Sequence, residues 1–225
     1  MVTRRANLTA FAVAAAVLYG VLWLGYSQNW GWLRSVDWPL LTAAHDIGLK
    51  HPAWVWFWDG VSFVLGPDPL RVLGILGAAA LAVKRNVRAA LLLLTCLPLS
   101  GFVTAAAKGM AGRPRPATAL IVVPETSFPS GHALEGMAAA LALLTVTLPL
   151  LGAPARRIAV GAAALCVLAV GTARVALNVH HPSDVLAGWA LGYLYFLLCL
   201  LVIRPTVWSR RGDPTGAEPL LDPAL

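Results

Sequence analysis

The sequence predicts an all-α integral membrane protein with six transmembrane helices and an interfacial helix between the first and second. Two observations support this fold class. Of the 225 residues, 59% are hydrophobic and 12% are charged, whereas a soluble domain carries about 25% charged residues. The apolar residues also gather in runs that approach the length of a bilayer span. These runs cover residues 8–26, 70–83, 89–107, 134–151, 158–172 and 185–203.

The individual runs differ in how clearly they predict a span. Run 8–26 follows Arg4 and Arg5 and is not followed by the small-residue site of a cleaved signal peptide, so we interpret it as a retained first helix. Segment 51–66 is apolar, but Asp59 and its bounding prolines favour a helix lying in the outer interface. Runs 70–83 and 158–172 are short and need flanking residues. Run 185–203 reaches roughly 28 Å, about one hydrocarbon core.

The basic residues predict the orientation of these spans. With six spans, the basic loops fall on one side, which the positive-inside rule assigns to the cytoplasm together with both termini. The polar motifs described below then fall on the outer side. We expect one membrane domain over residues 1–208 and a disordered cytoplasmic tail over residues 209–225. The basic clusters are Arg4-Arg5, Lys84-Arg85 with Arg88, Arg156-Arg157, and Arg204 with Arg210-Arg211.

Composition also limits the partners and cofactors. The net charge of +7 fits contact with anionic lipid head groups, and the absence of a soluble basic face argues against nucleic acid. No Cys/His spacing suggests zinc and no carboxylate cluster suggests another metal, so we expect no metal and no cofactor. The bilayer is the expected partner, and no obligate protein partner is evident.

The first polar cluster ends an apolar run. Lys108 closes the run, and Arg115-Pro116 follows at i+7 in a segment rich in glycine and proline. Lys108 and Arg115 can converge on one anion, although both can also be interfacial cations that snorkel to the head groups. We expect Arg113, between them, to face solvent or head groups.

The second cluster begins a predicted helix. Ser130 and Gly131 lie where a helix N-terminus offers free N–H groups to an anion, and His132 is held at its mouth. The alternatives are an ordinary N-cap for Ser130 and an interfacial histidine for His132. Glu135, three residues after His132, either tunes that histidine or faces a polar cavity.

The third cluster contains a histidine and a carboxylate. Asp184 lies four residues after His180 and can fix its tautomer, leaving the other ring nitrogen free to attack. Arg174 lies six residues before His180 and can face the same anion. A purely structural His–Asp pair is the alternative, and for His181 we expect no partner.

These three clusters resemble the motifs of the type 2 phosphatidic acid phosphatase (PAP2) family, whose superfamily includes the vanadium haloperoxidases. The family pattern is K-x6-RP, then PSGH, then SR-x5-H-x3-D. The chain matches it from Lys108 to Arg115-Pro116, from Pro129 to His132, and from Arg174 to Asp184. The match covers residues 108–184. It departs from the pattern at Ala173, where the family has serine, and Thr172 would point elsewhere on a helix.

The resemblance implies a PAP2/haloperoxidase-like helical core and a role for each matching residue. His180 would be the nucleophile that forms a phosphohistidine, and Asp184 would orient it. His132 would protonate the leaving oxygen and then activate water. This chemistry needs no metal. The phosphate would be held by Lys108, Arg115, Ser130, Gly131 and Arg174.

A site at the membrane–water boundary predicts a lipid phosphate or diphosphate as substrate. The candidates are undecaprenyl diphosphate, phosphatidylglycerol phosphate and phosphatidic acid, and the sequence does not choose among them. An outward site fits recycling of a carrier lipid in the cytoplasmic membrane of a bacterium. The alternatives are a lipid-phosphate binder or transporter without hydrolysis and a lipid phosphotransferase that uses the same pocket. Paired histidines predict a bell-shaped pH profile.

Overall fold

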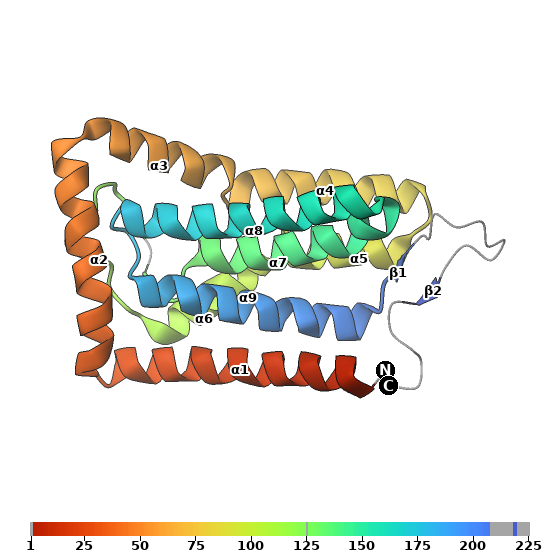
Figure 1. Cartoon of the computed structure of the whole chain (residues 1–225), viewed down its shortest axis with the longest axis horizontal. Helices are drawn as coiled ribbons and strands as arrows, with labels where there is room; N and C mark the ends of the chain where they lie inside the picture. Colours follow the sequence, from red (N-terminus) through yellow and green to blue (C-terminus); the bar gives the residue numbers. More distant parts are fainter. Residues whose placement is uncertain (1, 125, 208–217, 220–225) are drawn as a thin grey trace.

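The computed structural model describes residues 2–124, 126–207 and 218–219, which form a bundle of α-helices (Figure 1). A pair of two-residue antiparallel strands, β1 (Thr206–Val207) and β2 (Glu218–Pro219), follows the last helix. The helices are α1 (Val2–Ser27), α2 (Gly31–Lys50), α3 (Pro52–Val64), α4 (Pro67–Val83), α5 (Val87–Cys96), α6 (Ser100–Ala111), α7 (Gly131–Thr147), the 3-10 helix η1 (Leu148–Leu150), α8 (Ala153–Ala176) and α9 (Pro182–Ile203).

The prediction of six spans is confirmed for the part of the chain that the structure describes. Two spans are built from two helices each: α3 and α4 follow one another, and so do α5 and α6. Breaks at Gly66 and around Pro98 separate the paired helices. The six apolar stretches cover Asn7–Ser27, Pro52–Val83, Val87–Ala111, Gly131–Leu150, Ala153–Ala176 and Pro182–Ile203.

The position predicted for the interfacial helix is wrong. The helix that crosses the end of the bundle is α2, whereas α3 turns along α8 and leads into α4 (Figure 1). Pro52 and Pro67 each begin a helix, a position where the missing N–H of proline costs nothing. These prolines therefore do not confine segment 51–66 to the interface.

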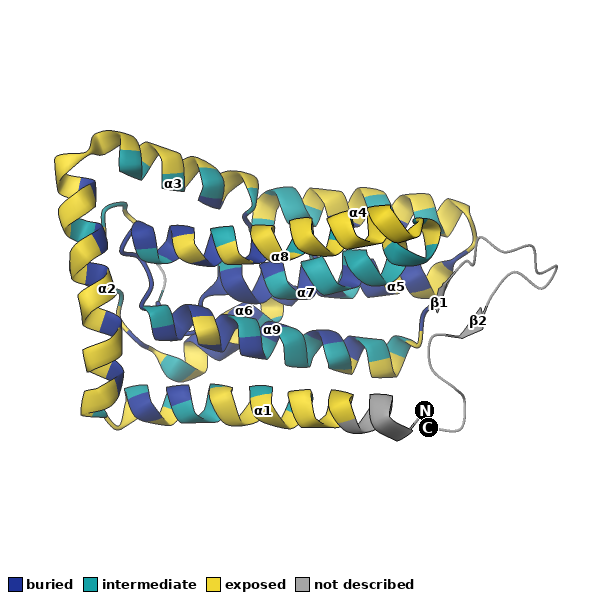
Figure 2. Ribbon diagram, viewed as in Figure 1, coloured by how far each residue is buried: buried dark blue, intermediate teal, exposed yellow. Residues whose placement is uncertain are grey.

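The outer faces of the helices are largely exposed (Figure 2), and many of the exposed residues are large hydrophobic ones. Phe11, Trp56, Phe102 and Val202 are examples from four different helices, and all four are exposed. Such a surface has no favourable contact with water, but it matches the hydrocarbon of a bilayer. The protein is therefore an integral membrane protein.

Helices α7 and α9 pack closely at the centre of the bundle. Gly188 and Gly192 of α9 lie against the backbone of α7, and a Cβ atom at Gly188 would come within 2.6 Å of the carbonyl oxygen of Ser130. Small residues four apart let two membrane helices approach to backbone contact. The N-termini of α7 and α9 are joined as well, because the Ser130 N–H donates to the Asp184 carbonyl at 2.9 Å.

This contact brings the polar motifs to one end of the bundle. Loop 112–130 and loop 177–181 both lie there, beside α2 (Figure 1). The basic residues Arg85, Arg156 and Arg204 lie at the opposite end, at the α4–α5 turn, the start of α8 and the end of α9. Residues 218–219 of the predicted disordered tail form β2, and the rest of segment 209–225 lies outside the described residues.

Candidate active site

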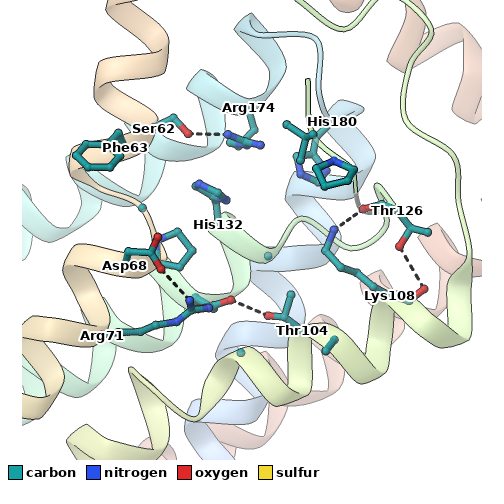
Figure 3. Close-up of a pocket in the computed structure, with 18 of the residues that line it drawn as sticks. Ser62, Phe63, Asp68, Arg71, Thr104, Lys108, Thr126, His132, Arg174 and His180 are labelled. Carbon is teal, nitrogen blue, oxygen red and sulfur yellow. Dashed lines mark hydrogen bonds and ion pairs between the residues drawn. The ribbon is translucent and has the colours of Figure 1, made fainter. Parts of the chain in front are cut away.

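A cavity of about 550 Å³ lies between α3, α4, α6, α7 and α8. Six of the eight predicted site residues line it. Figure 3 shows Lys108, His132, Arg174 and His180 around the same space. The other two predicted site residues, Ser130 and Asp184, are buried and do not line the cavity. The six that line the cavity are Lys108, Arg115, Gly131, His132, Arg174 and His180.

Lys108 and Arg115 are held by the loop that separates α6 from α7. Gly112 ends α6 in the left-handed conformation, with φ of 63°, which glycine adopts without strain. The Lys108 ammonium donates to the carbonyl of Thr126. Arg115 reaches across to loop 177–181 and donates from one nitrogen to the Val179 carbonyl at 2.6 Å.

Gly131 opens α7 at a point where no side chain fits. A Cβ atom there would lie 2.7 Å from the Thr104 methyl group, so the bare backbone comes close to α6 and the cavity. Ser130 occupies the N-cap position, yet its hydroxyl caps no backbone group and has no hydrogen-bond partner among the described residues. His132 follows in the first turn, and a Cβ at Gly66 would lie 3.3 Å from its Nε2.

Arg174 and the buried His180 complete this side of the cavity. Arg174, in the last turn of α8, donates to the Ser62 hydroxyl of α3 at 2.7 Å (Figure 3). An Arg115 nitrogen lies 3.0 Å from His180 Nε2. Because guanidinium only donates, Nε2 accepts, which places the proton of the neutral ring on Nδ1. Burial lowers the pKa of His180 from 6.5 to about 3, so the ring is neutral at pH 7.

Asp184 contacts the predicted His180 and, more closely, the neighbouring His181. Its Oδ2 accepts from the His181 N–H at 2.8 Å and lies 3.1 Å from His181 Nδ1, whereas His180 Nδ1 is 3.7 Å away. The expectation that His181 lacks a partner is therefore wrong. A carboxylate in the first turn of a helix can reach residues three and four positions earlier. The backbone N–H of His181 draws the Asp184 carboxylate closer to His181 than to His180.

The expectation for Arg113 is also wrong, because its side chain is buried rather than exposed to head groups. One guanidinium nitrogen donates to Asp184 at 2.6 Å and to the Ser183 hydroxyl at 2.8 Å, and the other donates to Asp37 of α2 at 3.0 Å. Asp37 also accepts from the Ser183 N–H and hydroxyl. This Arg113 cluster (Arg113, Asp37, Ser183 and Asp184) anchors the start of α9 to α2.

Asp37 was not identified from the sequence, because Asp37 and its partner Arg113 lie far apart in the chain. A signal was nevertheless present. Leu33, Asp37, Leu41, Ala44 and Gly48 recur at three- and four-residue spacing and form the buried stripe of α2. A carboxylate in such a stripe requires a buried cation as its partner.

A second polar wall faces the cavity from α4, α6 and α7. The Glu135 carboxylate accepts from Arg71 at 3.0 Å and from the Thr104 hydroxyl at 3.2 Å. Arg71 also donates to Asp68 at 2.8 Å (Figure 3). Of the two expectations for Glu135, the polar cavity is the one that matches this geometry.

Two further observations concern the predicted chemistry. Ala173, where the family motif has serine, is buried, and Thr172 is exposed and does not replace it. Among the described residues, no group of three or more His, Cys, Asp or Glu side chains could hold a metal ion.

Comparisons with known proteins identify the family and a similar fold. The family model described as the PAP2 superfamily matches residues 89–208, just over half of the chain. The fold is similar to the crystal structure of a transmembrane PAP2 type phosphatidylglycerolphosphate phosphatase from Bacillus subtilis. The TM-score is 0.69 and the sequence identity is 25%, over 85% of this chain and 94% of that chain.

Proposed function

This chain belongs to the PAP2 superfamily, and from that premise we propose that it is a membrane-embedded phosphatase that hydrolyses a lipid phosphate or diphosphate. The observation that carries the proposal is the shared cavity: two histidines line it together with the cationic side chains Lys108, Arg115 and Arg174, which come from separate segments. Three cations around one space suit a tetrahedral anion whose charge is redistributed in a transition state.

In the first step, His180 Nε2 attacks phosphorus and the bond to the lipid oxygen breaks. His132 gives its proton to that oxygen, so the lipid leaves with a protonated hydroxyl group or, from a diphosphate, as a monophosphate. The Nε2 lone pair faces Arg115, and an entering phosphate would take over this guanidinium. Lys108 and Arg174 would bind the remaining phosphate oxygens together with the free N–H groups at the start of α7.

In the second step, water attacks the phosphohistidine and His132 accepts its proton. Phosphate leaves, and His180 returns to the neutral state that burial favours. Asp184 would stabilise the transient positive charge on the ring from its position 3.7 Å away. The cationic side chains provide the charge stabilisation, so activity should persist in the presence of EDTA.

We propose that the site faces outward and that both termini are cytoplasmic. The support is the arrangement of charge, since the basic residues at the α4–α5 turn, the start of α8 and the end of α9 lie at the end opposite the cavity. A carrier-lipid diphosphate, phosphatidylglycerol phosphate and phosphatidic acid remain the candidate substrates, in the cytoplasmic membrane of a bacterium.

The test is phosphate release from each of these three lipids by the purified protein in lipid nanodiscs. His180→Ala should lower turnover at least about 10³-fold, and the exposed His51→Ala serves as the matched histidine control. Quenching with radiolabelled substrate should trap a phosphohistidine that survives alkali and is lost in acid.

Other outcomes would favour other functions. Lipid binding that survives His180→Ala, without phosphate release by the wild type, would favour a binder or transporter. A phosphorylated acceptor in place of free phosphate would favour a phosphotransferase. No turnover of any lipid phosphate would contradict the proposal.

A further inference from the structure

The cavity is larger than a phosphate site requires, and its two ends differ in charge. A volume of about 550 Å³ lies in the range of pockets that bury whole small molecules. Arg115 and Arg174 line one end with His180. Lys108 lies nearer the middle, because a Cβ atom at Gly131 would lie 3.8 Å from its Cε and 3.7 Å from Glu135 Oε1. Among the described lining residues the acidic ones are Asp68 and Glu135, and both lie at the other end with Arg71 (Figure 3).

Glu135 lies beside the histidine that would protonate the leaving group. It follows His132 by three residues on α7, a spacing that places two side chains on the same helix face. In the proposed reaction the leaving oxygen takes its proton from His132. The part of the lipid attached to that oxygen therefore extends toward Glu135, Thr104 and Arg71.

Hydrogen bonds fix the Glu135 carboxylate in this position. Its side chain is 4% exposed, and it accepts from Arg71 and from the Thr104 hydroxyl. A carboxylate offers about four acceptor positions, so it can still accept from hydroxyl groups of a bound ligand.

We propose that Glu135, supported by Thr104 and Arg71, forms a leaving-group subsite that selects phosphomonoesters whose alcohol carries a free hydroxyl group. This inference rests on the phosphatase function proposed above and names its substrate class. Such an alcohol has the donors that a carboxylate needs. The second phosphate of a lipid diphosphate is anionic and brings acceptor oxygens, which the carboxylate repels.

Arg71 does not reverse this preference. Its guanidinium is already shared by two carboxylates, Glu135 and Asp68. The Arg71 end of the cavity therefore has no excess positive charge with which to bind a second phosphate. The simpler interpretation is a structural tie between α4 and α7, and it predicts equal losses of activity on all substrates.

The test compares the kcat/KM ratio for two lipids in nanodiscs. The leaving group of phosphatidylglycerol phosphate carries a free hydroxyl on the carbon next to the ester carbon, and its phosphodiester anion lies at the far end of the glycerol unit. The leaving group of undecaprenyl diphosphate has no hydroxyl donor, and its phosphate is bonded directly to the scissile oxygen. Glu135→Gln should lower kcat/KM about tenfold for the first lipid, the effect of one charge-assisted hydrogen bond, and raise it for the second. The exposed Asp46→Asn is the matched control and should leave the ratio unchanged.

If Glu135→Gln changes kcat/KM by the same factor for both lipids, the subsite is overturned and the phosphatase function still stands. No phosphate release from either lipid by the wild type would overturn both proposals. A measurement on the wild type covers the case in which Glu135→Gln does not fold. Soluble glycerol 3-phosphate should inhibit at a concentration at least about tenfold lower than inorganic pyrophosphate does, and the reverse order would overturn the subsite.

Discussion

The buried ion pair between Arg113 and Asp37 gives a quantitative prediction about the anchoring of α2. The two side chains are 8% and 1% exposed, and their closest atoms are 3.0 Å apart. Arg113→Met and Asp37→Asn each remove one charge, and the double variant removes both. A double-mutant cycle then isolates the coupling free energy of the pair from the other contacts of each residue.

The expected coupling is about 3 kcal/mol. Two unit charges about 4 Å apart interact by about 4 kcal/mol at an effective dielectric constant of 20. Breaking one buried pair commonly costs about 3–5 kcal/mol, because the remaining charge stays desolvated. Arg113 also bonds to Asp184, so its single substitution should destabilise the protein more than Asp37→Asn does.

The free energy of unfolding should be measured in mixed detergent micelles for the wild type and the three variants. The matched control is the same cycle on Arg71 and Asp68, whose side chains are 39% and 82% exposed. An exposed pair of this kind contributes about 0.2–1 kcal/mol. A coupling for Arg113 and Asp37 below about 1 kcal/mol, or no larger than in the control, would refute the assignment of the pair as an anchor.

Three further predictions follow from other parts of the molecule. NMR in micelles should show that the His180 ring stays neutral between pH 5 and 8, because its pKa of about 3 lies below the value in the unfolded chain. The free energy of unfolding should therefore decrease as pH falls through 6.5. An NMR titration midpoint near pH 6.5 for this ring would contradict the prediction. In a variant without native cysteines, Val122→Cys should react with an impermeant maleimide added outside the cell, because residue 122 is 98% exposed, and Gly152→Cys should not react. The opposite labelling pattern would invert the proposed topology. Gly192→Ala should lower the free energy of unfolding by about 1–3 kcal/mol, since the new Cβ atom would meet an α7 carbonyl. Gly20→Ala is the control and should not destabilise α1, because a Cβ atom there has open space. Equal unfolding midpoints for the two variants would count against close α7–α9 packing.

The number of spans could be predicted from the sequence because a bilayer demands long apolar runs. The path between the first two spans could not. Segment 51–66 and α2 both combine tryptophans with polar residues, and composition alone does not tell which one crosses the end of the bundle. In the structure α2 contacts α8 and α9, and its buried stripe lies against loop 112–130 and the start of α9 through Gly48 and Asp37.

The motifs place six predicted residues around one cavity, but the contacts between motifs were beyond sequence reasoning. Asp37 and Arg113 are 76 residues apart, and Ser62 and Arg174 are 112 apart. No local periodicity connects such pairs. The second histidine partner of Asp184 was equally open: spacing permits both His180 and His181, and the backbone N–H of His181 brings the carboxylate closer to His181.

Helix α2 also determines the direction from which a head group can arrive. His45 Nδ1 lies 3.0 Å from the Thr118 carbonyl, and Asp37 accepts from Ser183, so α2 covers the loops that carry the phosphate-binding groups. The exposed lining residues Phe63 and Asp68 lie on the flank instead. Encounter is then a two-dimensional search within the leaflet, and velocity should scale with the mole fraction of substrate in the membrane rather than with its bulk molarity.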